Sequence, residues 1–294
     1  MALGYLLLFS SIVAFGLLGI FHKVADHPNC RPKMTALLLH FWGGILAVIY
    51  TLSFDDRGLN VPDRVWVIGS CTGLVASLTL FAFQTALKYG KISTSWLIIN
   101  LTGIVPVLMS LIIFKESLNP SKQVAILLVF VAMVMLWLDK KRDLKLAEKK
   151  AGAITVKSKW LPLMILTFFG QGLASSSQKV LVEAGVADYI WQFLIVFYWS
   201  GFLVILAMSI FREAKPNRRE ITTALIMAGC SVVGNVTMTL ALKTVKGSIA
   251  YPASSGSLIM VVLAGILFFR EKIHPVGVAG IICGISAILV LVMS

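Results

Sequence analysis

Two stretches of the chain carry the same pattern. Residues 81–120 read FAFQTALKYGKISTSWLIINLTGIVPVLMSLIIFKESLNP, and residues 236–275 read VTMTLALKTVKGSIAYPASSGSLIMVVLAGILFFREKIHP. Aligned without gaps at a shift of 155, both contain ALKxxKxS and both end in FxExxxP. The copies are strongly apolar, in a chain whose mean hydropathy is +0.91. The duplicated unit is therefore a set of membrane helices, and internal duplication is the usual architecture of a carrier whose halves enclose a central site.

The composition extends this interpretation to the whole chain. Hydrophobic residues make up 58% of it and charged residues 13%, whereas about a quarter of a soluble domain is charged. The apolar runs each approach the ~20 residues that cross ~30 Å of hydrocarbon as a helix. Their continuity rules out barrel strands, which alternate over ~10 residues. The sequence predicts an all-α membrane protein of ten transmembrane helices, at about 2–21, 34–54, 65–87, 93–114, 121–138, 160–181, 190–211, 221–242, 248–269 and 275–293.

Hydrophilic residues 139–159 form the one long linker and divide the helices five from five. We expect a first five-helix repeat at 1–138 and a second at 160–294. Further matches support the duplication: Gly16 aligns with Gly172 and Lys23 with Lys179 at a shift of 156. Because five is odd, the second repeat must enter the membrane inverted, which gives a pseudo-two-fold axis in the membrane plane.

Basic loops explain the net charge of +13 better than nucleic acid binding does, because such loops set orientation and meet anionic lipid headgroups. Nineteen of the 26 Lys and Arg residues lie on the linker's side of the membrane, eight of them in the linker itself. The positive-inside rule then favours a cytoplasmic linker in a cell (inner) membrane, although without the linker the difference falls to 11 against seven. The four cysteines show no metal-ligand or disulfide spacing, and we expect no metal or cofactor.

The ends of the fourth and ninth runs carry a family resemblance. Residues 106–120 read PVLMSLIIFKESLNP and residues 267–275 read LFFREKIHP, each an apolar run followed by Phe-basic-Glu and a helix begun by Pro. With ten helices in two repeats, the chain resembles the EamA-like branch of the drug/metabolite transporter superfamily. The resemblance implies transport, in a family that includes exporters of amino acids and drugs and has relatives that carry sugars and nucleotide-sugars. We expect Glu116 and Glu271 to fix their short loops by pairing with neighbouring basic residues, or else to act in gating.

The predicted spans contain no Asp or Glu. The related four-helix multidrug exporters use a membrane-embedded glutamate for proton coupling, so this chain departs from that pattern. The polar groups available near the midplane are neutral. They include His40, Gln84, Asn100, Gln171, Gln178, Gln192 and Asn235.

These neutral groups fall on helix faces. Trp96 and Asn100 lie on one stripe of the fourth helix, and their repeat equivalents in the ninth are Tyr251 and Ser255. An amide without a partner in hydrocarbon costs several kcal/mol, so the faces must point to protein or water. We expect one central cavity between the repeats. The alternative is hydrogen bonding between helices. The predicted substrate-binding residues are Trp96, Asn100, Gln171, Gln178, Asn235, Tyr251 and Ser255.

Breaks in the fourth and ninth helices are also expected. Pro106 interrupts the former, and residues 251–257, YPASSGS, combine proline, glycine and three serines in the latter. Broken helices at equivalent places in two repeats point to a carrier's binding site, although a packing role is the alternative.

Lys23 and Lys179 form a symmetric pair at the ends of the first and sixth helices. One interpretation is that their ammonium groups extend to the lipid headgroups. The other is that they capture an anionic group of the substrate, and on this second interpretation we include both lysines among the predicted substrate-binding residues.

The sequence thus predicts a secondary transporter that moves a small polar organic metabolite, such as an amino acid or a sugar, by alternating access. The sequence lacks GxxxxGK[ST], so the energy must come from a gradient or from the substrate itself. The first alternative is a membrane enzyme acting on a lipid-linked substrate, but such enzymes place acids, His or Arg in or beside the membrane. A scaffold or receptor is the other alternative. We predict no enzyme, no catalytic residues and no nucleic acid partner. The predicted partners are the substrate and the lipid bilayer, and the oligomeric state is left open.

Overall fold

The computed structural model describes residues 2–26, 28–90, 92–106, 159–209, 215–245, 247–254, 256–270 and 274–292. It also describes positions 120, 121, 123, 124, 127, 128, 131, 132, 134, 135, 138, 139 and 142. Every regular element in these residues is helical. The elements are α1 (Ala2–Ala25), α2 (Pro32–Phe54), α3 (Asp63–Leu87), α4 (Ile92–Leu101), α7 (Trp160–Glu183), the short η1 (Ala187–Tyr189), α8 (Ile190–Ser209), α9 (Arg218–Leu242), α10 (Gly247–Ser254), α11 (Ser257–Leu267) and α12 (Pro275–Val292).

The helices confirm the predicted all-helical membrane fold. Five stretches are long and apolar enough to cross a membrane, namely Leu3–Ala25, Pro32–Phe54, Asp63–Leu87, Ala187–Met208 and Arg218–Leu242. Of the ten predicted runs, 121–138 is described at 10 of its 18 positions, all of them helical, and residues 107–114 of the fourth run lie outside the described residues. The other predicted runs are helical where they are described, except for turn residues at 256, 268 and 269 in the ninth run.

The packing of the helices follows the duplication. The most extensive contact of α1 is with α9, and the most extensive contact of α7, the repeat equivalent of α1, is with α3, the equivalent of α9. Helix α2 packs against its own equivalent α8, and α4 packs against α11. These reciprocal contacts are what a two-fold relation between inverted repeats requires.

Two glycines repeat this symmetry at the level of single residues. A Cβ added at Gly16 would lie 2.7 Å from Met260 Sδ, and a Cβ at Gly172 would collide with the side chain of Val105. Gly172 is the repeat equivalent of Gly16, and Met260 is the equivalent of Val105 at the shift of 155. The two positions therefore allow the same close approach of helices on the two sides of the pseudo-axis.

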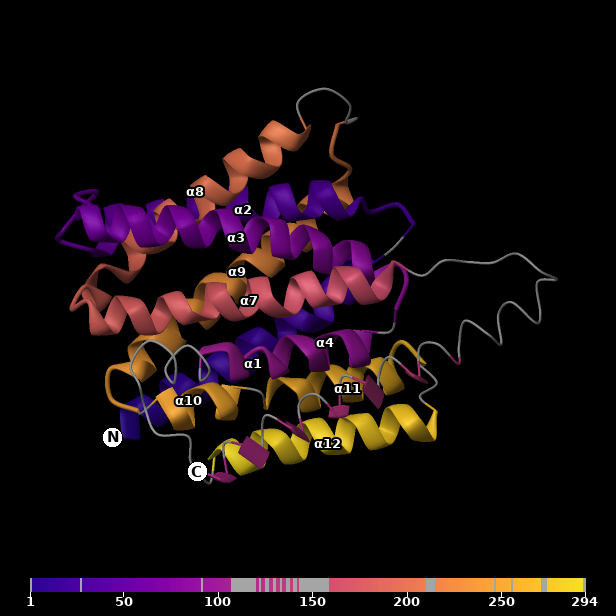
Figure 1. Cartoon of the computed structure of the whole chain (residues 1–294). Helices are drawn as coiled ribbons and strands as arrows, with labels where there is room; N and C mark the ends of the chain where they lie inside the picture. The colour runs from indigo at the N-terminus through magenta and orange to yellow at the C-terminus, as the bar shows by residue number, and fades with distance from the viewer. Residues whose placement is uncertain are drawn as a thin grey trace.

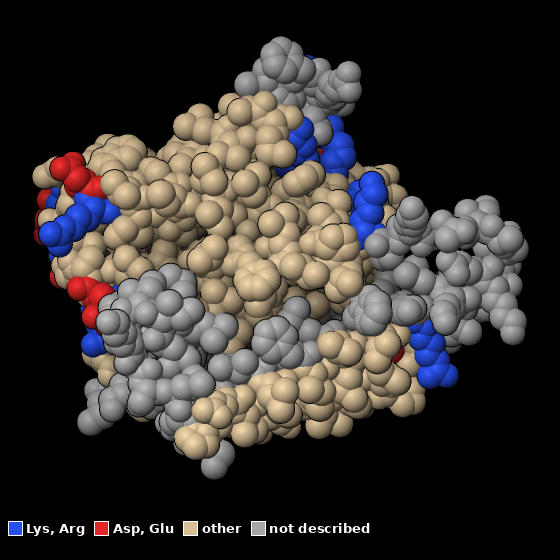
Figure 2. Space-filling view, viewed as in Figure 1, with Lys and Arg blue, Asp and Glu red and all other residues tan. Residues whose placement is uncertain are grey.

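The surface is what a membrane protein requires. Figure 2 shows Lys, Arg, Asp and Glu at the two ends of the bundle, with a broad uncharged band between them. Large apolar side chains of the spans are exposed, among them Leu52, Phe169, Leu203 and Ile282. In Figure 1, α1 begins and α12 ends at the same end of the bundle, and α7 begins at the opposite end. Ten spans place the two termini on the same side of the membrane, and five spans before the linker place the linker on the other side, so this arrangement is the expected one.

The fourth and ninth helices are interrupted at similar places. Helix α4 ends at Leu101, residues 102 and 103 form a turn, and helical structure resumes at Ile104. Helix α10 ends at Ser254, and Gly256 forms a turn before α11. When the repeats are aligned at the shift of 155, Gly256 corresponds to residue 101, so the two breaks lie within two residues of each other. The breaks expected in both helices are thus present, and in the fourth helix the break precedes Pro106 by one turn.

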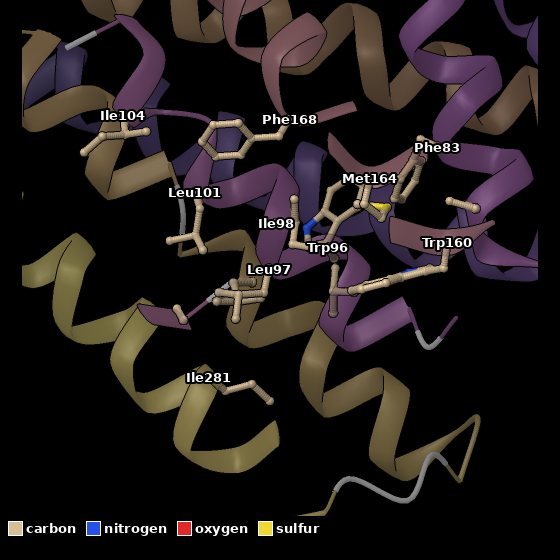
Figure 3. Packing of buried hydrophobic residues seen from close by; sticks show 14 of the residues in the cluster. Phe83, Trp96, Leu97, Ile98, Leu101, Ile104, Trp160, Met164, Phe168 and Ile281 are labelled. Atoms are coloured by element: carbon tan, nitrogen blue, oxygen red, sulfur yellow. The ribbon is translucent and has the colours of Figure 1, made fainter. Parts of the chain in front are cut away.

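The largest apolar cluster lies beside α4. Figure 3 shows Trp96 and Leu97 of α4 among side chains from α7 and α12. The indole of Trp160, at the start of α7, donates a hydrogen bond of 2.9 Å to Ser95 Oγ. This cluster fixes the broken helix α4, and with it the position of Trp96, against the second repeat.

Candidate functional site

A cavity of about 190 Å³ lies between the two halves of the protein. Its walls come from α1, α2, α3 and α4 on one side and from α7, α8, α9, α10 and α11 on the other. None of its described lining residues is Asp, Glu, Lys or Arg. A solute with a net charge would therefore enter a low-dielectric space without an opposite charge among these residues, which is unfavourable.

Five of the predicted site residues line this cavity together. They come from both repeats and from four separate helices: Trp96, Gln171, Gln178, Asn235 and Tyr251. The side chain of Asn100 and the whole of Ser255 lie outside the described residues, as do Glu116 and Glu271.

The two predicted lysines are not among the residues that line the cavity. Lys23 Nζ lies 2.9 Å from Asp26 Oδ2, one turn further along at the end of α1. Lys179 follows Gln178 on α7 and is partly buried. Their proposed capture of an anionic group stays a prediction.

On the second repeat's side of the cavity, polar groups form hydrogen-bonded pairs. Gln178 Nε2 donates to Asn235 Oδ1 at 2.9 Å, and Asn235 Nδ2 donates to the Ser231 carbonyl at 2.8 Å. The Tyr198 hydroxyl donates to Ser231 Oγ at 2.7 Å. These bonds hold α7, α8 and α9 together and fix the orientation of the carboxamides. The prediction of a polar cavity wall and the alternative of hydrogen bonding between helices are thus both true of the same residues.

Trp96 and Tyr251 occupy equivalent positions with different contacts. Trp96 packs against α1, where a Cβ on Gly19 would lie 2.6 Å from the indole. Tyr251 OH donates to the Ser175 carbonyl of α7 at 3.2 Å, and Ser175 is the repeat equivalent of Gly19. Each aromatic residue therefore contacts the first helix of its own repeat, Trp96 on α1 and Tyr251 on α7, at equivalent positions.

Aromatic rings surround Trp96 on the first repeat's side. The ring centroids of His22 and Phe83 lie 5.2 Å apart at an interplanar angle of 89°, and both rings lie within 6 Å of Trp96, at 5.9 and 5.8 Å. His22 Nδ1 lies 3.4 Å from Gln84 Nε2. Edge-to-face contacts of this kind are favourable for aromatic pairs.

The sequence did not single out every residue of the walls. Phe83, Phe197 and Tyr198 line the cavity, yet an aromatic residue in an apolar run carries no signal of its own. Ser231 was detectable, because it lies four residues before Asn235 and hence on the same helix face.

Polar contacts join the repeats near each end of the bundle. At the end where α2 begins, Glu220 accepts three hydrogen bonds of 2.9 Å from Arg31, from the backbone N–H, Nε and Nη2. At the end where α2 finishes, Gln192 Nε2 donates to Asp55 Oδ2 at 3.1 Å, and Arg57 donates to the Asp188 carbonyl at 2.6 Å. The cavity lies between these two layers of contacts.

Comparison with known proteins agrees with this architecture. The model of the EamA-like transporter family matches twice, at residues 2–138 and 157–293. Solved structures match as well, in 28 chains. One of them, a crystal structure of a protein with 15% sequence identity, has a TM-score of 0.65 and covers 99% of this chain and 96% of its own, which shows the likeness of fold. No curated protein matches. Because one family match falls in each of the halves that enclose the cavity, the chain belongs to the EamA-like transporter family.

Proposed function

We propose that this protein is a secondary carrier that moves a small polar organic metabolite without net charge across the cytoplasmic membrane. The observation that carries the proposal is the neutral cavity between the two repeats. Membership of a transporter family decides against the alternative of a membrane enzyme, and it leaves the substrate open. A zwitterion such as an amino acid and an uncharged solute such as a sugar or nucleoside both satisfy the charge requirement.

The size of the cavity supports a small substrate. Its volume of about 190 Å³ exceeds the ~150 Å³ of a cavity that accommodates benzene, and it lies below the ~300 Å³ at which pockets for drug-sized ligands begin. A single ring system with a short polar group fits these limits. The proposed binding residues are Trp96, Gln171, Gln178, Asn235 and Tyr251, with Asn100 and Ser255 as further candidates and Lys23 and Lys179 nearer the mouths.

Alternating access follows from the contacts at the two ends. Opening one end requires separation of Arg31 from Glu220. Opening the other requires separation of Asp55 from Gln192 of α8 and of Arg57 from η1. Rocking of one repeat against the other exposes the cavity to each side in turn. We propose that the end holding Arg31 faces the cytoplasm, because the basic linker precedes α7 at that same end.

The experiment is a thermal-shift screen of the detergent-purified protein, followed by uptake into proteoliposomes. The panel contains neutral amino acids, sugars, nucleosides, carboxylates and quaternary ammonium compounds. A ligand at ~100 times its Kd stabilises the protein by about 2.7 kcal/mol, which is enough to detect. We expect neutral compounds to stabilise the protein and to accumulate. Stabilisation and uptake of charged compounds alone would contradict the proposal.

A further inference from the structure

The two repeats contribute side chains of different polarity to the cavity. Each carboxamide that the structure places on the wall belongs to the second repeat, and its equivalent in the first repeat is a ring or an aliphatic side chain. Asn100 and Ser255, whose side chains are not described, are left out of this comparison. At shifts of 156 for α7 and 155 for α9, the pairs are Phe15 and Gln171, His22 and Gln178, and Leu80 and Asn235.

The polar wall presents groups that are already oriented. Gln178 and Asn235 are joined by a bond of 2.9 Å, and Ser231 receives the Tyr198 hydroxyl at 2.7 Å. Ser231 also has an apolar equivalent in the first repeat, Ala76. A carboxamide has two donors and an acceptor with two lone pairs, so Gln178, which gives one donor to Asn235, has further capacity for a ligand. Asn235 already uses its Oδ1 for Gln178 and its Nδ2 for Ser231, and it holds Gln178 in place. Groups held in place by neighbours lose little entropy when they bind.

The opposite wall provides little for a polar group to bind. The hydroxyls of Thr72, Thr79 and Thr102 each donate to a carbonyl of their own helix at 2.5–2.7 Å. The rings of His22, Phe83 and Trp96 also line this side, within 6 Å of one another, as does His40, whose Nδ1 is bonded to the Ala36 carbonyl at 2.9 Å. Phe193 and Phe197 of the second repeat also line the cavity, stacked on each other at 5.8 Å.

We propose that the substrate has two parts and binds in one orientation. A planar apolar group packs against His22, Phe83 and Trp96, and a hydrogen-bonding group without net charge meets Gln171, Gln178 and Asn235. This inference rests on the proposed carrier function and narrows its substrate class. It favours aromatic zwitterions and nucleosides over sugars and small aliphatic amino acids, which have no planar group to bury against the rings.

Matched compounds test the inference by equilibrium binding to the full-length purified protein. Phenylalanine, tryptophan and adenosine have both parts; alanine, glucose and ribose have the polar part alone; toluene and indole are mainly apolar. At least one compound of the first group should bind ten times or more tightly than its counterparts in the other two groups. Equal binding of glucose or alanine would overturn the two-part inference while leaving the carrier function intact. If no neutral compound of any group binds or is transported, both proposals are wrong.

Variants test the orientation. Asn235→Leu installs the residue of the first repeat and should weaken binding of the two-part compound at least tenfold, and Ser231→Ala, which installs the equivalent Ala76, should act in the same direction. Phe83→Ala should weaken the two-part compound and leave alanine and ribose unaffected. The control Thr237→Leu lies two residues from Asn235 but does not line the cavity, so binding should be unchanged. Equal effects of Asn235→Leu and Thr237→Leu on binding, with both proteins folded, would contradict the proposed orientation.

Discussion

The ion pair between Arg31 and Glu220 makes a quantitative prediction about the opening of one end. The Glu220 side chain is fully buried and its carboxylate accepts four hydrogen bonds of 2.9 Å, three from Arg31 and one from the Asn217 backbone N–H. Removing one partner of a buried pair costs about 3–5 kcal/mol. Glu220→Gln keeps the shape and part of the hydrogen bonding, and a third of the Arg31 side chain is exposed, so we expect about 2–3 kcal/mol.

In the proposed cycle these contacts form when the end closes and break when it opens, so their loss shifts the conformational equilibrium toward the open form. A change of 2–3 kcal/mol corresponds to about a 30- to 150-fold larger ratio of open to closed molecules. Arg31→Lys, which keeps the charge but loses the forked geometry, should have a smaller effect in the same direction.

The chain contains its own reporter for this opening. Cys30 is a free thiol that directly precedes Arg31, and it is 1% exposed. Burial raises the pKa of the Cys30 thiol, which lowers its reactivity in the closed form. In a protein whose other three cysteines are replaced by serine, a water-soluble maleimide should label Cys30 about 30- to 150-fold faster after Glu220→Gln.

The control is Arg57→Ala, which removes a contact at the opposite end. It should leave the labelling of Cys30 unchanged or make it slower, because opening of one end keeps the other closed. Unaltered labelling in Glu220→Gln, or equal acceleration in both variants, would refute the assignment of this ion pair to the closed state.

Three further predictions concern other parts of the molecule. Gly172→Leu should lower the thermal stability by about 1–3 kcal/mol, because its side chain would overlap Val105, and a melting curve at wild-type stability would contradict the close approach. Lys23→Gln should leave substrate affinity within a few-fold of wild type if Lys23 only pairs with Asp26, whereas capture of an anionic group predicts a loss of about 10- to 150-fold in a binding assay. A single cysteine in the 139–159 linker should resist impermeant maleimide in intact cells, and labelling from outside would reverse the proposed orientation.

Much of the fold was predictable because the duplication constrains it. The equivalence of Gly16 and Gly172 in the sequence corresponds to equivalent helix contacts in the structure. The polar stripe containing Gln171 and Gln178 predicted a cavity, and both residues line the cavity of the structure. Apolar spans hold few polar residues, and each must face protein or water, so their positions are informative.

The aromatic wall was harder to predict for a physical reason. Phe83 and Tyr198 line the cavity but lie in spans rich in apolar residues. In such a span, hydropathy does not distinguish a ring that faces the cavity from a ring that faces lipid. The break in the fourth helix was expected near Pro106 but lies one turn before it, since a proline disturbs the carbonyl of the preceding turn. Contacts between distant helix ends, such as that of Arg31 with Glu220, depend on helix packing that residue spacing does not encode.

Transport itself is the most direct test of a neutral cavity between two repeats. Proteoliposomes containing the wild-type protein or Asn235→Leu are offered the panel of radiolabelled neutral and charged compounds, without ATP. We predict saturable uptake of at least one neutral or zwitterionic compound by the wild-type protein, at least tenfold slower at limiting substrate in Asn235→Leu, and none in protein-free liposomes. Uptake restricted to compounds with a net charge, or uptake at the same rate in Asn235→Leu, would contradict the account.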